Sequence, residues 1–569
     1  MRRLFSELKR RKVYGAAAMY AAAAWLLVQV STQVAPYFDI PNSPVRALIV
    51  TLAIAFPFVL VLSWFYDLTP QGLRRDSRDA AVALDAAGAA LVTPSDQSIA
   101  VLPFADMSEN SDQRHFSDGL AEELLNLLAQ VPQLKVIART SSFSFKGKDA
   151  DITTIAAALN VAHVLEGSVR KSGDALRVTA QLIRAADSTH VWSRTFDLKM
   201  TDVFAVQDQI AGAVVSALKM KLLPDAHTDS TRRTSNAEAY EQYLLGLDVL
   251  RHGRHADYRH AQPLFQRSIA LDPAFAPAWV GLATTQSIAA DFAGTIAQRF
   301  GDREAALASA ERAIALAPEL ADGYVIRGQL RHRQHWDWRG GIEDLERALA
   351  LDPNRSEVLC AAALGQYCVG DPEQALALAR RATTIDPLSW QAWTYCGLTL
   401  FQAARADEAC KALRRALQIS PQASIPRAIL GAIELLEGRY EQALEHYMVT
   451  SDGHRQAGIA CATHSLGRHD ESTLALAELE TKYAWGFSLQ IAEVHAWRGE
   501  ADAAFAWLDH ACERRDSGIP RLLGNWLLAA IKDDQRYTAL VRRLGLPDQF
   551  RVSTTPLESP SDNSAPGIN

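Results

Sequence analysis

The side chains best suited to chemistry form an acidic cluster that follows a short apolar run at positions 99–104. Its members can exchange protons or bind metal ions: Asp106, Glu109, Asp112, His115 and Asp118. Loops at the carboxyl ends of buried strands often hold the active sites of α/β domains, so the cluster could support acid–base or metal chemistry. A solvated loop leading into a helix, whose first turn favours acidic residues, explains the same pattern without chemistry. We favour this second interpretation.

Two pairs of histidines have a spacing that suits metal binding. His252 and His255, like His332 and His335, are three residues apart, which on a helix places both rings near one face. No cysteine or carboxylate stands at a fixed offset from either pair to complete a ligand set. We therefore interpret both pairs as polar helix surface and predict no metal site.

The segment Lys146-Gly147-Lys148 resembles a phosphate-binding loop only at its end, because the earlier glycine and the following Ser or Thr of GxxxxGK[ST] are missing. The six cysteines form no CxxC pair and are interpreted as buried thiols in a reducing compartment. No catalytic residue and no cofactor is therefore predicted, and we expect a protein that binds rather than catalyses.

The overall composition limits the class of partner. A chain of 569 residues is too long for one hydrophobic core, so several domains are expected. Its 58 basic and 65 acidic residues give a net charge of −7, which offers no general attraction to phosphate backbones. Nucleic acid is therefore not expected as a partner.

The first 75 residues read as a membrane hairpin. Two runs without charge, 13–36 and 47–66, are each long enough to cross a hydrocarbon core of about 30 Å as a helix. A cleaved signal peptide is the alternative for the first run, but its apolar region is too long and a second span follows at once. The lipid bilayer is thus a predicted partner through two helices.

Basic residues set the expected orientation of this hairpin. Six precede the first span, three follow the second, and the turn at 37–44 has none. Arg46, at the start of the second span, is the exception, and its side chain can extend to the interface. Both ends of the hairpin should therefore be cytoplasmic, and residues 76–97 read as a linker.

Residues 98–223 change to the pattern of a small α/β domain. Strands are expected at 99–104, 134–139, 162–171, 176–184 and 191–196, and helices at 116–131, 152–159 and 203–222. The pieces IAVLPFADMS, FSDGLAEELLNLLA and VAHVLEGSVRKSGDALRVTAQLIRAADSTHVWSRTFD are similar to the amino-terminal domain of TolB and to FlgO-like domains. The resemblance implies protein contacts in the bacterial envelope. TolB is periplasmic and carries a β-propeller, whereas this chain has neither a cleavable signal nor blade repeats.

Residues 236–545 contain an internal repeat of 34 residues. Pro353, Pro387 and Pro421 keep this step, and small residues at two helix-crossing positions keep it as well. The pattern resembles the tetratricopeptide repeat (TPR), which implies a solenoid of helix pairs, here about eight with a C-terminal cap. Residues 546–569 are rich in Ser, Pro and Asn and should be disordered. The predicted fold class is multidomain: a two-helix membrane hairpin, a small α/β domain and an all-α TPR solenoid.

The fifth and ninth positions of the first helices should face the concave groove. They are Val280, Thr284, Val325, Gln329, Cys360, Leu364, Thr394, Leu398, Ala428 and Ala432. TPR proteins that clamp a peptide carboxylate carry Lys and Asn there, and no cation stands among these ten. An apolar or aromatic segment of a protein or peptide partner is the better candidate ligand. The alternative is that the groove packs on the chain's own insertion at 287–303.

Three functions fit this organisation. The first is a membrane-anchored scaffold in the bacterial inner membrane, with cytoplasmic domains that bind proteins in signalling or envelope regulation and with homo-oligomers possible. The second is a regulatory relative of class III adenylate cyclases, whose rear half the layout resembles. Only 97 residues precede the α/β domain, however, so we expect no cyclase domain. The third is a Tol- or flagellar-type assembly protein that faces the periplasm.

Overall fold

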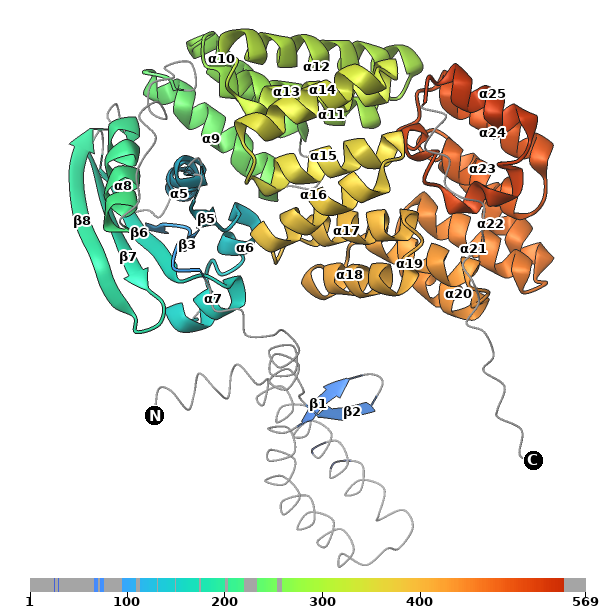
Figure 1. Cartoon of the computed structure of the whole chain (residues 1–569), viewed down its shortest axis with the longest axis horizontal. Coiled ribbons are helices and arrows are strands. Elements are labelled where there is room, and N and C mark those ends of the chain that lie inside the picture. Colours follow the sequence, from blue (N-terminus) through green and yellow to red (C-terminus); the bar gives the residue numbers. More distant parts are fainter. Residues whose placement is uncertain are drawn as a thin grey trace, which may run out of the picture. The chain divides into compact units, whose positions relative to one another are not determined.

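The structure is a computed structural model that describes residues 25, 29, 66–69, 72–75, 95–108, 113–129, 131, 133–148, 150–172, 175–199, 203–218, 233–252 and 258–546. The chain divides into two compact units, residues 1–93 and 94–569. The second unit holds a small mixed-sheet domain and a mostly helical TPR solenoid (Figure 1).

In the first unit the described residues are few. Strand β1 (Tyr66–Thr69) pairs antiparallel with β2 (Gly72–Arg75), so Tyr66, the last residue of the second predicted span, begins a strand. The predicted membrane spans otherwise lie outside the described residues, apart from Trp25 and Gln29, which are helical. Among the residues that the structure describes, no helix is both long and apolar enough to cross a membrane.

The sheet of the second unit is parallel on one side and antiparallel on the other. The strand order is β5-β3-β6-β7-β8, and a short strand, β4, also pairs with β6. Their bounds are β3 Ser98–Val101, β4 Ala105–Asp106, β5 Lys135–Val136, β6 His163–Ser172, β7 Ala175–Arg184 and β8 Thr189–Lys199. The parallel strands β5, β3 and β6 are joined through helices, and β6 to β8 follow one another as antiparallel hairpins.

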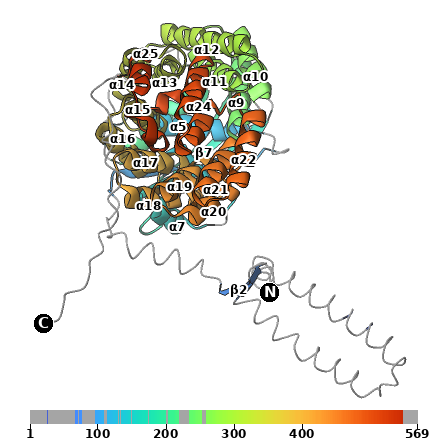
Figure 2. The ribbon, with the colours of Figure 1, turned by 90° about the vertical axis from the view of Figure 1, so that its right-hand side faces the viewer.

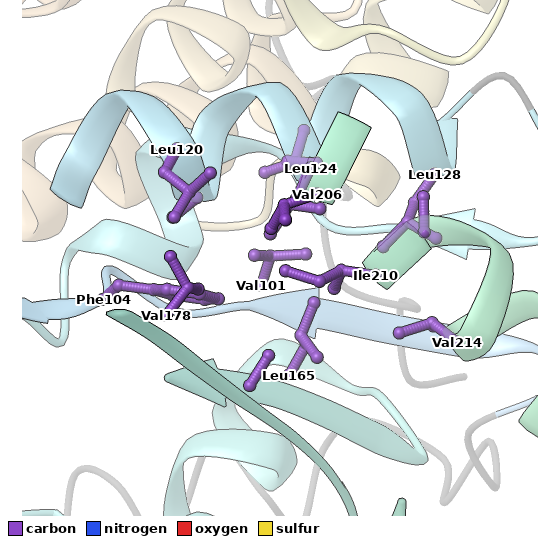
Figure 3. Packing of buried hydrophobic residues seen from close by; sticks show 14 of the residues in the cluster. Val101, Phe104, Leu120, Leu124, Leu128, Leu165, Val178, Val206, Ile210 and Val214 are labelled. Atoms are coloured by element: carbon purple, nitrogen blue, oxygen red, sulfur yellow. The ribbon is translucent and has the colours of Figure 1, made fainter. Parts of the chain in front are cut away.

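Helices cover both faces of this sheet. Helices α5 (Arg114–Ala129) and α8 (Val203–Ala217) pack on one face, where their leucines and valines meet Val101, Leu165 and Val178 (Figure 3). The alternate residues Ala100 and Leu102 point to the other face, against α7 (Ile152–Leu159). The short helix α6 (Arg139–Phe143) follows β5. Alternation along the strands therefore provides two apolar layers.

The described part of the solenoid contains eight helix pairs (Figure 1). They are α9 (Ala237–His252) and α10 (Tyr258–Leu271), α11 (Ala276–Asp291) and α12 (Ile296–Leu316), α13 (Ala321–Leu330) and α14 (Trp338–Leu351), α15 (Ser356–Val369) and α16 (Pro372–Ile385), α17 (Trp390–Gln402) and α18 (Ala406–Ile419), α19 (Ser424–Leu436) and α20 (Tyr440–Met448), α21 (Gly453–Ser465) and α22 (His469–Lys482), and α23 (Ser488–Trp497) and α24 (Ala501–Glu513). The turns η6 (Ile519–Arg521) and η7 (Trp526–Ile531) and helix α25 (Gln535–Arg543) follow.

Small side chains let the two helices of each pair approach. Ala375, Ala409 and Ala443, which repeat every 34 residues, are all fully buried. The residues predicted as an inserted loop at 287–303 instead lengthen the second pair: α11 continues to Asp291 and α12 has 21 residues. The third pair contains a π-helical turn, η5 (Arg331–His335), before Trp336.

Gly397 lies at a crossing where a side chain has no room. A Cβ atom there would lie 2.6 Å from Cγ of Leu413, which is fully buried. We expect Gly397→Leu to lower the free energy of unfolding by about 1–3 kcal/mol, because the core must shift to admit the new atoms. The measurement is thermal or urea unfolding of the full chain.

The matched control is Gly301→Leu on α12, where a Cβ atom would meet nothing within 4 Å. This variant should be as stable as the wild type or slightly more stable, because leucine favours helix more than glycine does. Equal destabilisation by the two variants would contradict the assigned crossing.

Candidate functional site

The C-terminal segment turns back over the first helices of several pairs. Turn η6 packs against α15, and η7 packs against α19 and α23. The indole nitrogen of Trp526 donates a hydrogen bond to the carbonyl of Phe401 at 3.2 Å, and Leu522 and Leu528 are fully buried. Burial of each leucine contributes about 1.5–3 kcal/mol to the stability of the folded state, so the segment should remain packed on the array.

A cavity of about 120 Å³ lies between this segment and the wall of the array. Its wall is mostly apolar, and Ile425 stands 43% exposed among the lining residues. The lining residues are Tyr367, Leu398, Phe401, Ile425, Ala428, Ile429, Ala432, Tyr447, His454, Ala457, Gly458, Cys461, Leu489, Gln490, Glu493, Arg521, Gly524, Asn525, Trp526 and Leu527. The volume suits one apolar side chain or a small molecule, as in cavities of about 150 Å³ that hold benzene.

Charged groups of both signs line this apolar cavity. Glu493 on α23 is only 8% exposed, and its Oε1 accepts a hydrogen bond from Asn525 Nδ2 at 2.6 Å. Burial raises the pKa of Glu493, against the smaller effects of that hydrogen bond and of the charges of His454 and Arg521. His454 is already engaged through Nδ1 with Asp452 at 2.8 Å. The arrangement can hold a polar ligand group beside an apolar one.

The ten predicted groove residues are divided by the structure. Leu398, Ala428 and Ala432 come together in the cavity wall. Val280, Thr284, Val325 and Gln329, on the neighbouring helices α11 and α13, are half-buried and lie outside the cavity, and we call these four the N-terminal strip. Leu364 is half-buried and packs against the core of the C-terminal segment, while Cys360 and Thr394 are buried.

Thr394 differs from its expected environment. As the fifth position of its helix, Thr394 is expected to face the groove. Arginine at this position would then weaken the binding of an apolar ligand without changing the stability of the array. In the structure Thr394 is 3% exposed, and its hydroxyl donates to the carbonyl of Trp390 at 2.6 Å. Thr394→Arg would bury a charge and should destabilise the array, so the simple test that the repeat pattern suggests is wrong at this position.

The α/β domain docks directly on the solenoid through α6. The backbone nitrogen of Ser141 donates to Oδ1 of Asp386 at 3.1 Å, and its hydroxyl also bonds to this oxygen. The backbone nitrogen of Leu388 donates to the Ser141 hydroxyl at 2.8 Å. Asp386 is 2% exposed, and burial raises its pKa to about 7, although the hydrogen bonds from Ser141 oppose the shift.

A second long-range contact joins the second helix pair to the last two. The guanidinium of Arg299 donates to the carbonyls of Arg514 at 3.2 Å and Trp485 at 3.4 Å. Arg303 donates to the carbonyl of Arg515 at 3.1 Å. Figure 2 shows the array from the side of its C-terminal helices. The lengthened second pair therefore contacts the last two pairs of the array. The segment that packs over the first helices is the C-terminal segment and not the insertion at 287–303.

The acidic cluster of the α/β domain has structural roles where it is described. Both carboxylate oxygens of Asp106 accept backbone hydrogen bonds, from Ser108 at 2.9 Å and Gln113 at 2.8 Å, which close the loop. Asp118 is buried rather than solvated and forms an ion pair with Lys146 of the lysine-glycine-lysine segment. Glu109 and Asp112 lie outside the described residues.

The predicted histidine surface is partly wrong. His332 is buried in the turn η5, and its Nε2 lies 3.1 Å from the carbonyl of Trp338. Burial lowers the pKa of His332. His335 lies 3.8 Å from Glu304, and no group of three potential metal ligands occurs in the part of the chain that the structure describes. Trp338 packs in the core.

The six cysteines are buried and unpaired, and all lie within the described ranges. Burial raises the pKa of each thiol, for example of Cys396 to about 11. The thiols are therefore protonated at neutral pH and are poor nucleophiles.

Sequence reasoning missed the polar groups of the cavity. Glu493 stands on a first helix, but in a pair where the repeat pattern is loose, and Arg521 and Asn525 belong to the segment predicted only as a cap. The only available signal was the chain's irregular end, because the fold-back that brings these residues to the wall has no period. Searching the cap for charges could have found Arg521 but could not have placed it.

Comparisons with known proteins match separate parts of the chain. A family model described as the second domain of HilA/YgeH-like transcriptional regulators matches residues 95–213. The matched range covers most of the α/β domain and stops within α8, and it does not support the predicted likeness of this domain to TolB. The "Putative adenylate cyclase 3" of Rhizobium meliloti is 36% identical over 190 residues, which cover 33% of this chain and 32% of that protein.

Two further matches concern the repeats. Tetratricopeptide repeat protein 36 of Bos taurus is 46% identical over 70 residues, or 12% of this chain and 37% of that protein. A tetratricopeptide repeat protein from Parabacteroides merdae is 12% identical, with a TM-score of 0.34 and coverage of 47% of this chain and 99% of that one. The chain spans about a third of the length of the curated relatives that it matches.

Asp386 gives a test of the docking contact by pH. Because burial raises its pKa to about 7, the folded chain binds more protons than the unfolded chain between about pH 4 and that value. Its contribution to stability should therefore be lost as pH rises, by at most about 1.4 kcal/mol per pH unit. The measurement is unfolding of the full chain at a series of pH values.

Asp386→Asn is the matched variant, since an amide oxygen can still accept from Ser141 but does not titrate in this range. The stability of the wild type relative to this variant should fall between about pH 4 and pH 7 and then become constant. A difference that stays the same at every pH would contradict the shifted pKa.

Proposed function

We propose that the chain is a non-enzymatic, membrane-anchored scaffold in the bacterial inner membrane, whose cytoplasmic domains bind protein partners. TPR arrays are a protein-interaction fold, and this coarse part of the assignment rests on the helix pairs and their repeat. The membrane anchor, the location and a role in signalling are the finer parts of the proposal.

The observation that carries the proposal is the N-terminal strip. Its four side chains are half-buried and uncharged. The later concave positions are buried, line the cavity or, in the case of Leu364, pack against the core of the C-terminal segment. A partner segment with apolar side chains suits this surface, because it can remove apolar area from water without leaving a charge unpaired. Partner binding is therefore assigned to α11 and α13.

The absence of enzymatic activity is supported by what happens to each chemical candidate. Among the described residues, the cysteines are buried thiols, Asp118 forms an ion pair with Lys146, and Asp106 accepts backbone hydrogen bonds. None of these groups combines a nucleophile with a base or a metal site. A binding role is the simpler explanation for such an arrangement.

Two of the matches support a role in signalling. One relative is named "Putative adenylate cyclase 3", and the matching family model describes transcriptional regulators. A second candidate follows from the first of these: the chain is a regulatory relative of adenylate cyclases. On our proposal the purified full chain should not convert ATP into cyclic AMP with magnesium or manganese. Cyclic AMP formation that a single carboxylate substitution abolishes would favour catalysis instead.

The proposed orientation has a direct test in cells. A reporter enzyme that is active only in the periplasm, fused after Arg78, should stay inactive, because the basic flanks hold both ends of the hairpin in the cytoplasm. A cytoplasmic fluorescent protein at the same position should fluoresce. The reverse pattern would support a periplasm-facing assembly protein.

The N-terminal strip is tested by Val280→Glu in the full chain, with crosslinking in cells and identification of the captured proteins. Burying an unpaired carboxylate costs more than burying an unpaired neutral polar group, which costs about 1–3 kcal/mol, so capture of a specific partner should fall by at least about tenfold. The control is Ala350→Glu, which adds the same charge at an exposed position of α14. Equal loss in both variants, or no loss in Val280→Glu, would contradict this surface.

A further inference from the structure

The cavity between α19, α21, α23 and the C-terminal segment contains two opposite charges that do not pair with each other. Glu493 has its hydrogen bond from Asn525, and no nitrogen of Arg521 comes within ion-pair distance of it. The Arg521 side chain has no hydrogen bond or ion pair with any other described residue. Opposite charges in an apolar wall attract strongly, so their separation leaves both able to meet a third group.

These two groups still act on each other. The charge of Arg521 is close enough to favour the ionised form of Glu493, although burial has the larger and opposite effect on its pKa. His454 is hydrogen-bonded to Asp452 through Nδ1. Of Glu493, Arg521 and His454 in the cavity wall, Arg521 is therefore the one whose side chain has no hydrogen-bond or ion-pair partner among the described residues. Glu493 has an amide as its hydrogen-bond partner in place of a cation.

Apolar side chains complete the surroundings. Leu398, Phe401, Ile429 and Trp526 line the same space, whose volume of about 120 Å³ admits one side chain of leucine or phenylalanine size. A matching ligand therefore has a cation, an anion and an apolar group on one small frame. An α-amino acid has all three.

We propose that this cavity is a binding site for a free α-amino acid with an apolar side chain, whose ammonium group meets Glu493 and whose carboxylate meets Arg521. The planar guanidinium can donate two parallel hydrogen bonds to a carboxylate. The site adds small-molecule recognition to the chain and does not depend on the partner surface of α11 and α13.

Calorimetric titration of the full chain with four probes separates the groups that are recognised. L-Leucine carries all three groups and should bind. Each of the other probes lacks one of them: L-leucinamide the carboxylate, N-acetyl-L-leucine the ammonium group and glycine the apolar side chain. Each of the last three should bind about ten- to a hundredfold more weakly, because a charge or an apolar contact is lost. Repeating the titration with L-phenylalanine tests the size limit.

Three outcomes would overturn the proposal. Absence of leucine binding at millimolar concentration, with phenylalanine also silent, would exclude the site. If leucinamide binds with the same affinity as leucine, a role for Arg521 is excluded. If N-acetyl-leucine binds with the same affinity as leucine, the cavity recognises a carboxylate alone, as at the end of a peptide.

Variants assign the effect to the two residues. Arg521→Gln and Glu493→Gln should each weaken leucine binding about ten- to a hundredfold, and Glu493→Gln retains an oxygen that accepts from Asn525. Arg542→Gln, at an exposed position of α25, removes the same charge outside the cavity and should bind leucine like the wild type. Unfolding curves confirm that the variants are folded, and wild-type affinity in folded Arg521→Gln would refute the assignment.

Discussion

The burial of the C-terminal segment against the first helices is the interaction on which the shape of the solenoid depends. An open array of repeats has contacts between neighbours only, and its stability is a sum of local terms. Here Trp526 bonds to Phe401 in the fifth pair, and Trp338 in the third pair donates to the carbonyl of Leu544 at 2.6 Å. These contacts join residues more than a hundred positions apart, so the later pairs should unfold together rather than one at a time.

The same constraint explains why the concave wall is not uniform. The wall residues near the segment are buried, pack against it or face the cavity, whereas the residues of the N-terminal strip are half-buried and lie outside the cavity. Arg299 and Arg303 add a contact between the second pair and the last two, made by guanidinium groups on backbone carbonyls. Burial lowers the pKa of Arg303 to about 10, so its charge persists at neutral pH.

The α/β domain is held to the array by a small number of polar contacts together with an apolar seam. Tyr240 of α9 lies edge-on to Phe116 of α5, with ring centroids 6.4 Å apart, and Leu244 fills the space beside Gly119. On the other side of the domain, Ser141 binds the buried carboxyl of Asp386. The domain thus contacts the first pair and the loop between the fourth and fifth pairs, which couples its position to the curvature of the array.

The sequence alone determined the elements whose cause is local. The 34-residue step of Pro353, Pro387 and Pro421 and the small residues at the crossings predicted helix pairs, because sterics at the crossing and the missing N–H of proline act within one repeat. The sequence pattern likewise predicted strands at 162–171, 176–184 and 191–196, where β6, β7 and β8 lie. Leu398, Ala428 and Ala432 were identified as wall residues from the repeat register alone.

Only the tertiary structure decided which wall residues form a site. Thr394 and Leu398 hold equivalent kinds of position in one helix, yet Thr394 is buried and Leu398 lines the cavity. Glu493 and Arg521 line the same cavity because the chain folds back over the array, and His332 is buried within the π-helical turn η5. No periodic pattern records the fold-back, since it depends on contacts between segments far apart in the sequence.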